Sequence, residues 1–479
     1  MRNSRKRRLF AYIFSFAMLL IMFGSHITAE AEENLGDSSP VFGYADILDY
    51  QFKESGDITI VTYNGNDKRV EIPSTIDGKT VIGIDEFVFW EHYELEEVVL
   101  PDTLQYIGMH AFSMTSISEI DIPEGVESIS DFAFMGCDNL KKITLPSTLK
   151  DISGAFYSNN TGKGCLEEIN VSSANPDFTS SYGILFNKDK SILMKFPSAR
   201  KGYYRIPESV EIIGYTAFEG SRLERVYIPD SVTKIGERAF SSTEIQGVFV
   251  PDTVETIGDN MLDDEYVYKR PILLGSKTSN FSEYAKEKHY DYVDPAGSFS
   301  DVEEDSFYYI PTLWASQAEP QITSGVGGNK FKPFTMCNRA QMITFLWKAK
   351  GCPGAVLTDN PFTDVSEDDF YFNAVMWAKQ AGITSGKTAT EFDPMGPCSR
   401  GQFVIFLWRA CGQEIVESES EFSDVAPGTD LSKAVSWACK YGITSGVTAT
   451  KFKPSTALNR AQAVTFLCRA RMMISLYDK

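Results

Sequence analysis

Histidine is scarce in this sequence, and its scarcity removes most of the familiar catalytic arrangements. Of its four histidines, only His92, His110 and His289 lie beyond residue 31, and none of these recurs at a repeat position or stands in a nucleophile motif. Carboxylates are abundant, so composition alone leaves a glycosidase pair open. Two repeat families nevertheless occupy nearly the whole chain. We therefore expect no enzyme, and no catalytic residue, cofactor or metal site.

Basic charge is also deficient, and the deficit narrows the range of partners. The chain has 45 Lys+Arg against 65 Asp+Glu, a formal net charge of −20 at pH 7. Binding to nucleic acid or to an anionic membrane surface depends on a basic face that displaces counterions. The sequence therefore predicts no nucleic-acid partner and no attraction to an anionic membrane.

Long apolar runs are limited to one, from Leu9 to Phe23, broken only by Ser15. Basic residues precede this run, and Ala29-Glu30-Ala31 follows it with the small residues that a signal peptidase requires. The run is shorter than the roughly 20 apolar residues of a membrane-spanning helix. Residues 1–31 are predicted to be a signal peptide, so we expect a secreted chain with no stable membrane insertion after cleavage.

The eight cysteines lack the spacings of a redox or zinc motif, since no Cys-x-x-Cys pair occurs. Cys337 and Cys398 occupy one repeat position, where the third copy has Leu458. A position that accepts leucine is an apolar packing site, so these cysteines are predicted to be small buried hydrophobes that stay mostly reduced.

A repeat of 22 or 23 residues dominates residues 44–290. Its marker is an aliphatic-Pro step, which recurs at Leu100-Pro101, Ile122-Pro123, Leu145-Pro146, Ile206-Pro207, Ile228-Pro229 and Val250-Pro251. Val98 and Leu100 alternate with exposed positions, as in a half-buried strand, and Pro101 then stops that strand. Each copy closes with Ala-Phe, as at Ala111-Phe112, and only stacked neighbours can bury that ring.

This pattern resembles the BspA-like leucine-rich-repeat family, whose period lies within the usual 20 to 29 residues. Residues 182–197 look like the longer insert rung of that family, and residues 275–287 are similar to its C-terminal cap. The resemblance implies a β-rich solenoid that binds protein or glycan ligands. One exposed position per strand predicts a column of ligand-binding residues: Val99, Asp121, Thr144, Asn170, Arg205, Tyr227 and Phe249. The alternative is a solvated face whose aromatic residues pack on one another.

A second repeat of 60 to 63 residues follows a predicted linker at 291–297, with copies at 298–352, 361–412 and 421–474. Each copy is predicted to fold as two helices around a turn. Asn338, Ser399 and Asn459 are predicted helix N-caps, and the glutamine three positions later completes a capping box. Trp314, Trp377 and Trp437 lie mid-helix, which favours core positions over a ligand platform.

These copies resemble the S-layer homology family, in which three repeats form an all-α, pseudo-threefold unit. Members bind secondary cell-wall polymers, commonly with pyruvylated sugars, in grooves between copies. The family's Thr-Arg-Ala-Glu motif matches Asn338-Arg339-Ala340-Gln341, Ser399-Arg400-Gly401-Gln402 and Asn459-Arg460-Ala461-Gln462. The resemblance implies a polymer-binding set of Asp301, Asp364, Asp424, Arg339, Arg400, Arg460, Gly325, Gly386 and Gly446.

Several roles stay open at this point. Each aspartate of that set has two alternatives, a cap on its local turn or a place in the groove. For the arginines, contact with a sugar carboxylate is favoured over a salt bridge to the neighbouring copy. The family's aromatic six residues after the aspartate is Phe307 and Phe370 in the first two copies but Asp430 in the third. The acidic cluster at 303–305 is predicted to be a solvated loop, with calcium binding as the alternative.

Together these features predict a multidomain, non-catalytic bacterial cell-surface protein. The repeats at 298–474 would hold it non-covalently on a secondary cell-wall polysaccharide, and the solenoid would bind an unknown protein or glycan. The alternative is a structural envelope component whose solenoid contacts copies of itself, which would assemble without ligand in light scattering.

Overall fold

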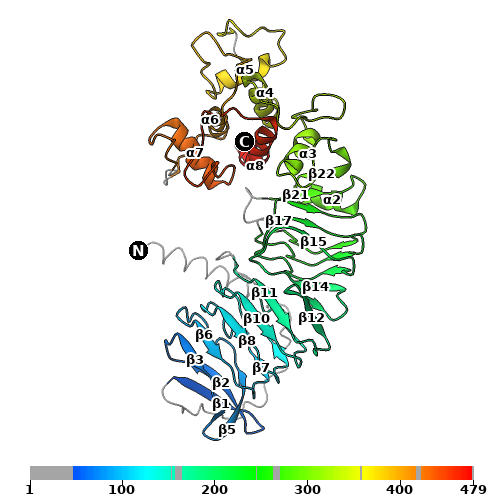
Figure 1. Cartoon of the computed structure of the whole chain (residues 1–479), viewed down its shortest axis with the longest axis vertical. Coiled ribbons are helices and arrows are strands. Elements are labelled where there is room, and N and C mark those ends of the chain that lie inside the picture. The colour runs from blue at the N-terminus through cyan, green and yellow to red at the C-terminus, as the bar shows by residue number, and fades with distance from the viewer. Residues whose placement is uncertain are drawn as a thin grey trace, which may run out of the picture.

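The computed structural model describes residues 47–152, 154–156, 164–243, 245–262, 270–356, 359–416 and 422–476. The predicted signal peptide, residues 1–31, lies outside these ranges. Figure 1 shows a curved stack of strands that leads into a group of helices at its C-terminal end. The predicted order, a β-rich solenoid followed by a helical repeat unit, is confirmed.

One set of solenoid strands comprises those that end at the aliphatic-Pro steps and three more that extend the same sheets, and we call them the proline-step strands. All of their pairings are parallel, because each strand meets the equivalent strand of the next rung: Ile120 with Ile143, and Val226 with Val248. These strands are β3 (Arg69–Glu71), β6 (Glu97–Val99), β8 (Glu119–Asp121), β10 (Lys142–Leu145), β11 (Glu168–Val171), β15 (Lys201–Arg205), β17 (Arg222–Tyr227), β19 (Gly247–Phe249), β21 (Ile272–Leu274) and β22 (Tyr292–Val293).

The second set of strands forms separate sheets, and four of its strands, those that end at Ile107, Ile213, Ile235 and Ile257, end at Ile-Gly steps. The hydrophobic core lies between the two sets. Gly236 and Gly258 have no room for a side chain, because a Cβ on either would meet the backbone of the preceding rung at 2.7 Å or less. This set comprises β2 (Ile58–Tyr63), β5 (Lys79–Ile84), β7 (Tyr106–Ile107), β9 (Ser128–Ile129), β14 (Ile192–Lys195), β16 (Ile212–Ile213), β18 (Lys234–Ile235) and β20 (Thr256–Ile257).

Antiparallel strands interrupt the solenoid at its start and in its middle. β1 (Leu48–Phe52) pairs with β2, and the short β4 (Thr75–Ile76) pairs with β5. In the middle, β12 (Phe178–Ser181), β13 (Ile184–Asn187) and β14 form an antiparallel meander. This meander is the insert rung that the sequence predicts at 182–197.

The phenylalanines of the Ala-Phe closures form two stacks inside the solenoid. Phe112 is fully buried, and its ring lies 5.2 Å from that of Phe89 and 5.7 Å from that of Phe134. After the insert rung, Phe218 lies between Phe196 at 5.2 Å and Phe240 at 4.9 Å. The rings of successive rungs bury one another, which is why no rung folds alone.

A third, shallower stack contains the imidazole of His110. It lies between the rings of Phe87 and Phe132, with centroids 4.9 and 5.0 Å away, and all three residues have φ between 55° and 62°. His110 Nδ1 is buried without a hydrogen-bond partner among the described residues. Burial lowers the pKa of His110 from 6.5 to about 4.

Replacing His110 with phenylalanine is expected to remove a pH dependence of solenoid stability. Between pH 6.5 and 4 the unfolded chain takes up a proton that the folded chain refuses, so stability falls as the pH drops through this window. At pH 5 the free energy of unfolding is expected to be about 2 kcal/mol lower than at neutral pH because of this one group. Phenylalanine fits, because Phe87 and Phe132 adopt the same backbone conformation. Urea unfolding at pH 7 and pH 5 measures the effect, and His289→Gln, outside the stack, should leave it in place.

The C-terminal end of the solenoid is capped by α2 (Asn280–Glu287). Within the described residues 270–356, no unstructured linker separates α2 from the helices that follow. The segment 291–297, predicted to be a linker, contains β22, which pairs with β21, and the 3-10 helix η2 (Pro295–Gly297). The structure therefore places this segment within the folded body, because its backbone completes the last sheet.

Three helix pairs follow, each from one of the long repeats, and we call them the ring. The pairs are α3 (Tyr309–Gln317) with α4 (Arg339–Ala349), α5 (Phe372–Gln380) with α6 (Arg400–Ala410), and α7 (Asp430–Lys440) with α8 (Arg460–Leu476). Capping boxes at Asn338 and Ser399 begin α4 and α6, as predicted. Trp314, Trp377 and Trp437 are buried, which confirms their core positions.

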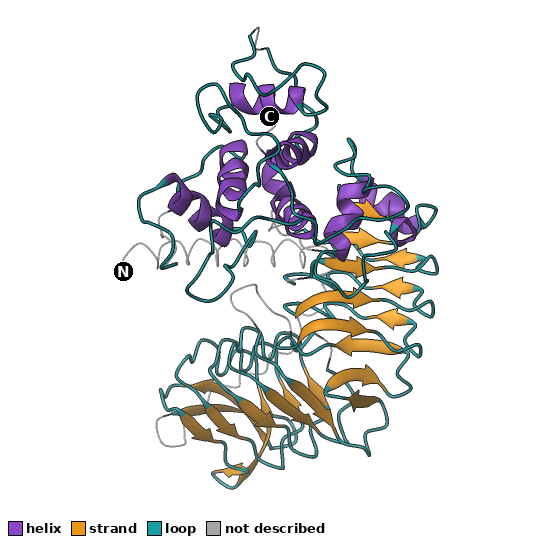
Figure 2. Cartoon of the chain, turned by 45° about the horizontal axis from the view of Figure 1, so that its top comes forward, coloured by secondary structure: helices purple, strands orange, loops and turns teal. Residues whose placement is uncertain are grey.

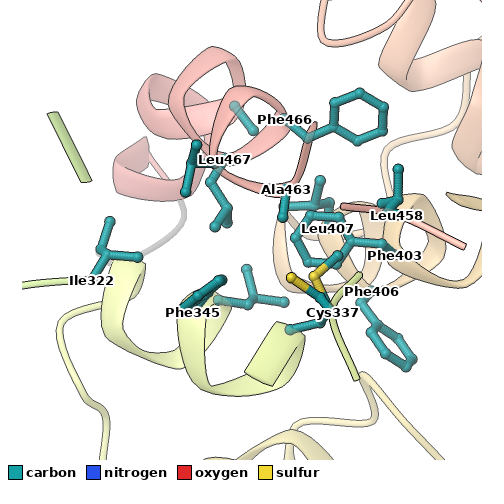
Figure 3. Packing of buried hydrophobic residues seen from close by; sticks show 14 of the residues in the cluster. Ile322, Cys337, Phe345, Phe403, Phe406, Leu407, Leu458, Ala463, Phe466 and Leu467 are labelled. Atoms are coloured by element: carbon teal, nitrogen blue, oxygen red, sulfur yellow. The ribbon is translucent and has the colours of Figure 1, made fainter. Parts of the chain in front are cut away.

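The three repeats close on one another at a central triangle of backbone hydrogen bonds. The N–H of Cys337 donates to the carbonyl of Leu458, that of Leu458 to Cys398, and that of Cys398 to Cys337, at 2.9 to 3.2 Å. All three side chains are buried, as their shared repeat position predicts. Figure 3 shows Cys337 and Phe345, Phe403 and Leu407, and Leu458 and Leu467, from three different repeats, in one core.

Candidate wall-binding seams

Each contact between neighbouring repeats of the ring carries one buried arginine, and we call these three contacts seams. Arg339 of the first repeat reaches the second, Arg400 of the second reaches the third, and Arg460 of the third returns to the first. They begin α4, α6 and α8, and each is between 5% and 7% exposed. The seams are therefore related by the pseudo-threefold arrangement.

Each guanidinium lies against two phenylalanines of the repeat that it enters. The centroid distances are 4.7 Å to Phe331 and 5.7 Å to Phe345 for Arg460. Arg339 lies over Phe392 and Phe406, and Arg400 over Phe452 and Phe466, at 4.6 to 5.8 Å. A guanidinium over an aromatic face gains a cation–π interaction that partly offsets its desolvation.

Backbone carbonyls and threonines complete the seams. Arg339 Nε donates to the carbonyl of Phe392 at 2.9 Å, and Arg460 Nε to that of Phe331 at 2.8 Å. Arg460 Nη2 donates to Thr323 Oγ1 at 3.1 Å, and Arg400 Nη2 donates to the equivalent Thr444. These arginines thus contact the neighbouring copy, but through carbonyls, hydroxyls and rings rather than through the salt bridge considered from the sequence.

The seams hold positive charge that the described residues leave without a counter-ion. No carboxylate of the described part of the chain lies within ion-pair distance of the three guanidinium groups. Burial lowers the pKa of all three arginines. Arg339 Nη2 and Arg400 Nε are also buried without a partner among these residues. Such groups favour an anion that can reach them.

The aspartates of the predicted set lie within their own repeats, where each caps a turn. Both carboxylate oxygens of Asp364 accept backbone N–H groups, from Phe392 at 2.8 Å and Asp393 at 2.7 Å. Asp301 and Asp424 repeat this arrangement. The backbone N–H of Phe452 lowers the pKa of Asp424. Each aspartate therefore fixes the loop that carries the phenylalanine under the arginine.

The glycines of the set permit the same loops. Gly325, Gly386 and Gly446 have φ of 79°, 90° and 85°. A Cβ on Gly386 would lie 2.5 Å from the carbonyl oxygen of Thr388 and 2.6 Å from Phe362 Cε1. These glycines let the backbone pass close to the phenylalanine side chain of the same repeat, and any larger residue there would be strained.

Exposed side chains make the three seams unequal. Phe307 and Phe370 are 49% and 69% exposed, whereas Asp430, at the equivalent position, forms an ion pair with Arg409 at 2.8 Å. The seams also differ beside the buried phenylalanine, where the first two repeats expose Phe334 and Met395 and the third has Ser455. The second–third seam therefore offers the least apolar surface.

Sequence reasoning missed one residue of each seam, the threonine of the Ile-Thr-Ser-Gly motif. Thr323, Thr384 and Thr444 are each 3% to 4% exposed, and two of them accept hydrogen bonds from the arginines. The signal that could have found them is the presence of this threonine in all three copies of the motif.

The predicted ligand column of the solenoid divides into two halves. Val99, Asp121, Thr144 and Asn170 are exposed or half-buried on β6, β8, β10 and β11. Arg205, Tyr227 and Phe249 instead contact the ring: Arg205 pairs with Glu304 at 3.4 Å, and Phe249 stacks on Tyr309 at 6.3 Å. The second half therefore has a partner within the chain, because the ring covers the last rungs.

Comparison with known families supports the presence of two repeat families in the chain. The family model described as BspA type leucine rich repeat region matches six copies, at residues 59–188 and 198–313, which together are more than half of the chain. The chain belongs to the BspA-type leucine-rich-repeat family. The S-layer homology domain model matches residues 361–404 and 421–464, the second and third long repeats. The first long repeat has the same elements, capping box and arginine.

Curated relatives match only parts of this leucine-rich-repeat protein. A cell surface protein of Thermoanaerobacter kivui is 36% identical over 115 residues, 23% of this chain and 15% of that protein. An endoglucanase of Bacillus sp. (strain KSM-635) is 27% identical over 188 residues, 38% of this chain and 19% of that protein. The matched part is thus less than a fifth of either relative.

Among solved structures, a leucine-rich repeat protein from Eubacterium ventriosum is 21% identical, with a TM-score of 0.34 over 45% of this chain and 66% of that chain. The pneumococcal vaccine antigen PcpA is 19% identical, with a TM-score of 0.36 over 50% of this chain and 82% of that chain. In the part of the chain that the structure describes, no helix has the length and apolar character to cross a membrane. S-layer homology domains anchor proteins to the cell wall, so this chain is a bacterial cell-surface protein.

Proposed function

We propose that the ring binds an acidic secondary cell-wall polysaccharide at its seams and that the solenoid presents a surface to a protein or glycan ligand, without catalysis. The observation that carries the first part is the set of three buried guanidinium groups without a carboxylate partner in the described chain. A buried charge without a counter-ion is costly, and a sugar carboxylate would supply one through charge-assisted hydrogen bonds.

The polymer's chemistry follows from the surroundings of each arginine. Phe307 and Phe370 are exposed rings that can lie against sugar faces, while the threonines and loop carbonyls offer polar contacts. A carboxylate-bearing sugar would therefore bind better than a neutral one. The first–second seam fits best, because Arg339 Nη2 there has no partner among the described residues and the repeat that it enters exposes Phe370 and Met395, which the second–third seam lacks.

For the solenoid, we propose that the free half of the column, Val99, Asp121, Thr144 and Asn170, belongs to the ligand surface. The exposed neighbours Glu97 and Glu119 share this face and give it acidic character. The other half is excluded from this surface, since Arg205, Tyr227 and Phe249 contact the ring. A ligand of this half would have to displace the first long repeat.

Replacing both Arg339 and Arg400 with methionine is expected to weaken retention on purified cell-wall sacculi at least about tenfold, since each charged contact contributes more than about 1 kcal/mol. Methionine fills much of the space beside the phenylalanine side chains, so the three helix pairs should keep their fold in the full-length protein. Co-sedimentation of the full chain with sacculi measures retention, before and after extraction of the polymer that is attached to peptidoglycan.

The matched control is Lys440→Met, which removes a cation of α7 that pairs with Glu414, just after α6; in the described part of the chain neither residue is a hydrogen-bond or aromatic partner of the three seam arginines. This variant should sediment like the unmodified protein. Equal retention of all three proteins would contradict the role of the arginines. Unchanged retention on extracted sacculi would show that peptidoglycan itself, and not the attached polymer, is bound.

A further inference from the structure

The solenoid and the ring meet at a contact that neither repeat family explains by itself. The residues involved are Tyr203, Arg205, Arg225, Gly247 and Phe249 of the proline-step strands, which we call the joint face. Opposite them lie the acidic loop, residues 303–306, and the start of α3. Figure 2 shows helices directly at the end of the strand stack.

Arg225 is the centre of this contact. It is 2% exposed, although rungs nearer the N-terminus carry the exposed charges Glu97 and Glu119 at the same repeat position. Its guanidinium donates to the backbone carbonyls of Glu304 and Ser306 and lies 4.8 Å from the ring centroid of Tyr203. The hydroxyl of Tyr203 donates to the carbonyl of Asp305 at 3.0 Å. The solenoid thus binds three consecutive carbonyls of the acidic loop.

A continuous set of stacked groups extends from the solenoid into α3. The Arg205 guanidinium lies 4.0 Å from the ring centroid of Tyr227, which stacks on Phe249 at 4.1 Å. Phe249 in turn stacks on Tyr309 of α3 at 6.3 Å. Arg205 also pairs with the carboxylate of Glu304, so the charge of the acidic loop complements that of the joint face.

Gly247 marks a position where α3 approaches the strand closely. In strand register it follows Tyr203 and Arg225, and Glu119 and Lys142 stand at the same distance before the prolines of their own rungs; all four have long side chains. A Cβ on Gly247 would lie 2.3 Å from Ile310 Cδ1 of α3. Glycine weakens a strand, so its presence here fits a close approach of the neighbouring helix.

The ring is attached at a second point. Arg471 of α8 forms an ion pair with Asp291 at 2.7 Å and donates to the carbonyl of Arg270, both near the last solenoid strands. The buried residues Ile272, Leu274 and Val293 of these strands share a core with the ring. The first and third long repeats are therefore both attached to the solenoid.

We propose that the joint face is a docking site for the acidic loop and α3, and that it holds the solenoid and the ring as one rigid body. The ring then fixes the direction in which the free half of the ligand column points from the wall. The rigid attachment stands on intramolecular contacts alone, and only the direction relative to the wall rests on the proposed function.

The test compares two glutamine substitutions in the full chain, both at the residue four positions before the proline of a rung. Gly247→Gln places a side chain where Ile310 lies, whereas Lys142→Gln changes the equivalent position on a rung that the ring does not cover. Hydrogen exchange measured by mass spectrometry follows peptides from 300–310 and from 212–235, and small-angle X-ray scattering follows the radius of gyration.

In Gly247→Gln we expect amides of 300–310 to exchange at least about tenfold faster, with a larger radius of gyration, while 212–235 keeps its protection. Lys142→Gln should match the unmodified protein in both measurements. Unchanged exchange at 300–310 in Gly247→Gln would overturn the proposal. Equal acceleration at 212–235 would also overturn it, because the added side chain would then act on the rung itself.

Discussion

Replacing Arg460 with alanine is expected to lower the free energy of unfolding of the ring by about 3 kcal/mol, since it leaves a cavity and removes two buried hydrogen bonds. The arginine of the third repeat lies between Phe331 and Phe345 of the first and donates to the Phe331 carbonyl and to Thr323. It therefore closes the ring between its last and first repeats. Urea unfolding followed by tryptophan fluorescence measures the loss, because Trp314, Trp377 and Trp437 are all buried in the ring.

Arg460→Met is the matched variant that separates packing from charge. Methionine keeps most of the apolar contact with the two rings and buries no charge, so its stability should stay within about 1 kcal/mol of the unmodified protein. Binding to the wall polymer should nevertheless fall. A stable Arg460→Met variant with full wall retention would restrict this arginine to ring closure. An Arg460→Ala variant as stable as the unmodified protein would refute the closure itself.

The solenoid could be predicted from the sequence because its stabilising contacts repeat with the chain. Each Ala-Phe closure occurs at a fixed distance from its aliphatic-Pro step, and the structure pairs equivalent residues of adjacent rungs, such as Val226 with Val248. The capping boxes of the ring were predicted for the same reason, since N-cap and glutamine are three residues apart. Local spacing decides these features.

The roles of the arginines could be predicted only in part. Invariant spacing gave Arg339, Arg400 and Arg460 the same position in each copy. The phenylalanine side chain that each arginine covers, however, belongs to the next copy. A sequence repeat does not state which copies touch. It therefore could not distinguish a guanidinium over an aromatic ring from one in a salt bridge.

The joint could not be predicted, because it brings two unrelated repeats together only once in the chain. The sequence assigned Arg205, Tyr227 and Phe249 to a ligand column, since their strand positions alternate as exposed positions do. The structure covers them with the first long repeat. A weak signal existed at Gly247, the glycine in a column of long side chains.

Replacing Phe112 with alanine is expected to lower the free energy of unfolding of the solenoid by about 4 kcal/mol, the usual cost of removing a fully buried ring. Phe112 has a stacked neighbour on each side, Phe89 and Phe134, so neither adjacent rung can collapse into the space. Phe156 is the comparison, because it is only half-buried and its described stacking partner is Phe134, at 6.0 Å.

We expect Phe156→Ala to cost less than half as much as Phe112→Ala, because part of the cavity would open to solvent. Thermal unfolding by calorimetry compares the two variants. Equal losses would mean that a phenylalanine with two stacked neighbours is no more important than one with a single neighbour. Each rung would then contribute its stability independently of the rungs beside it. The graded result follows from the same physical cause as the fold, since a rung of this solenoid buries its phenylalanine only against the rungs beside it.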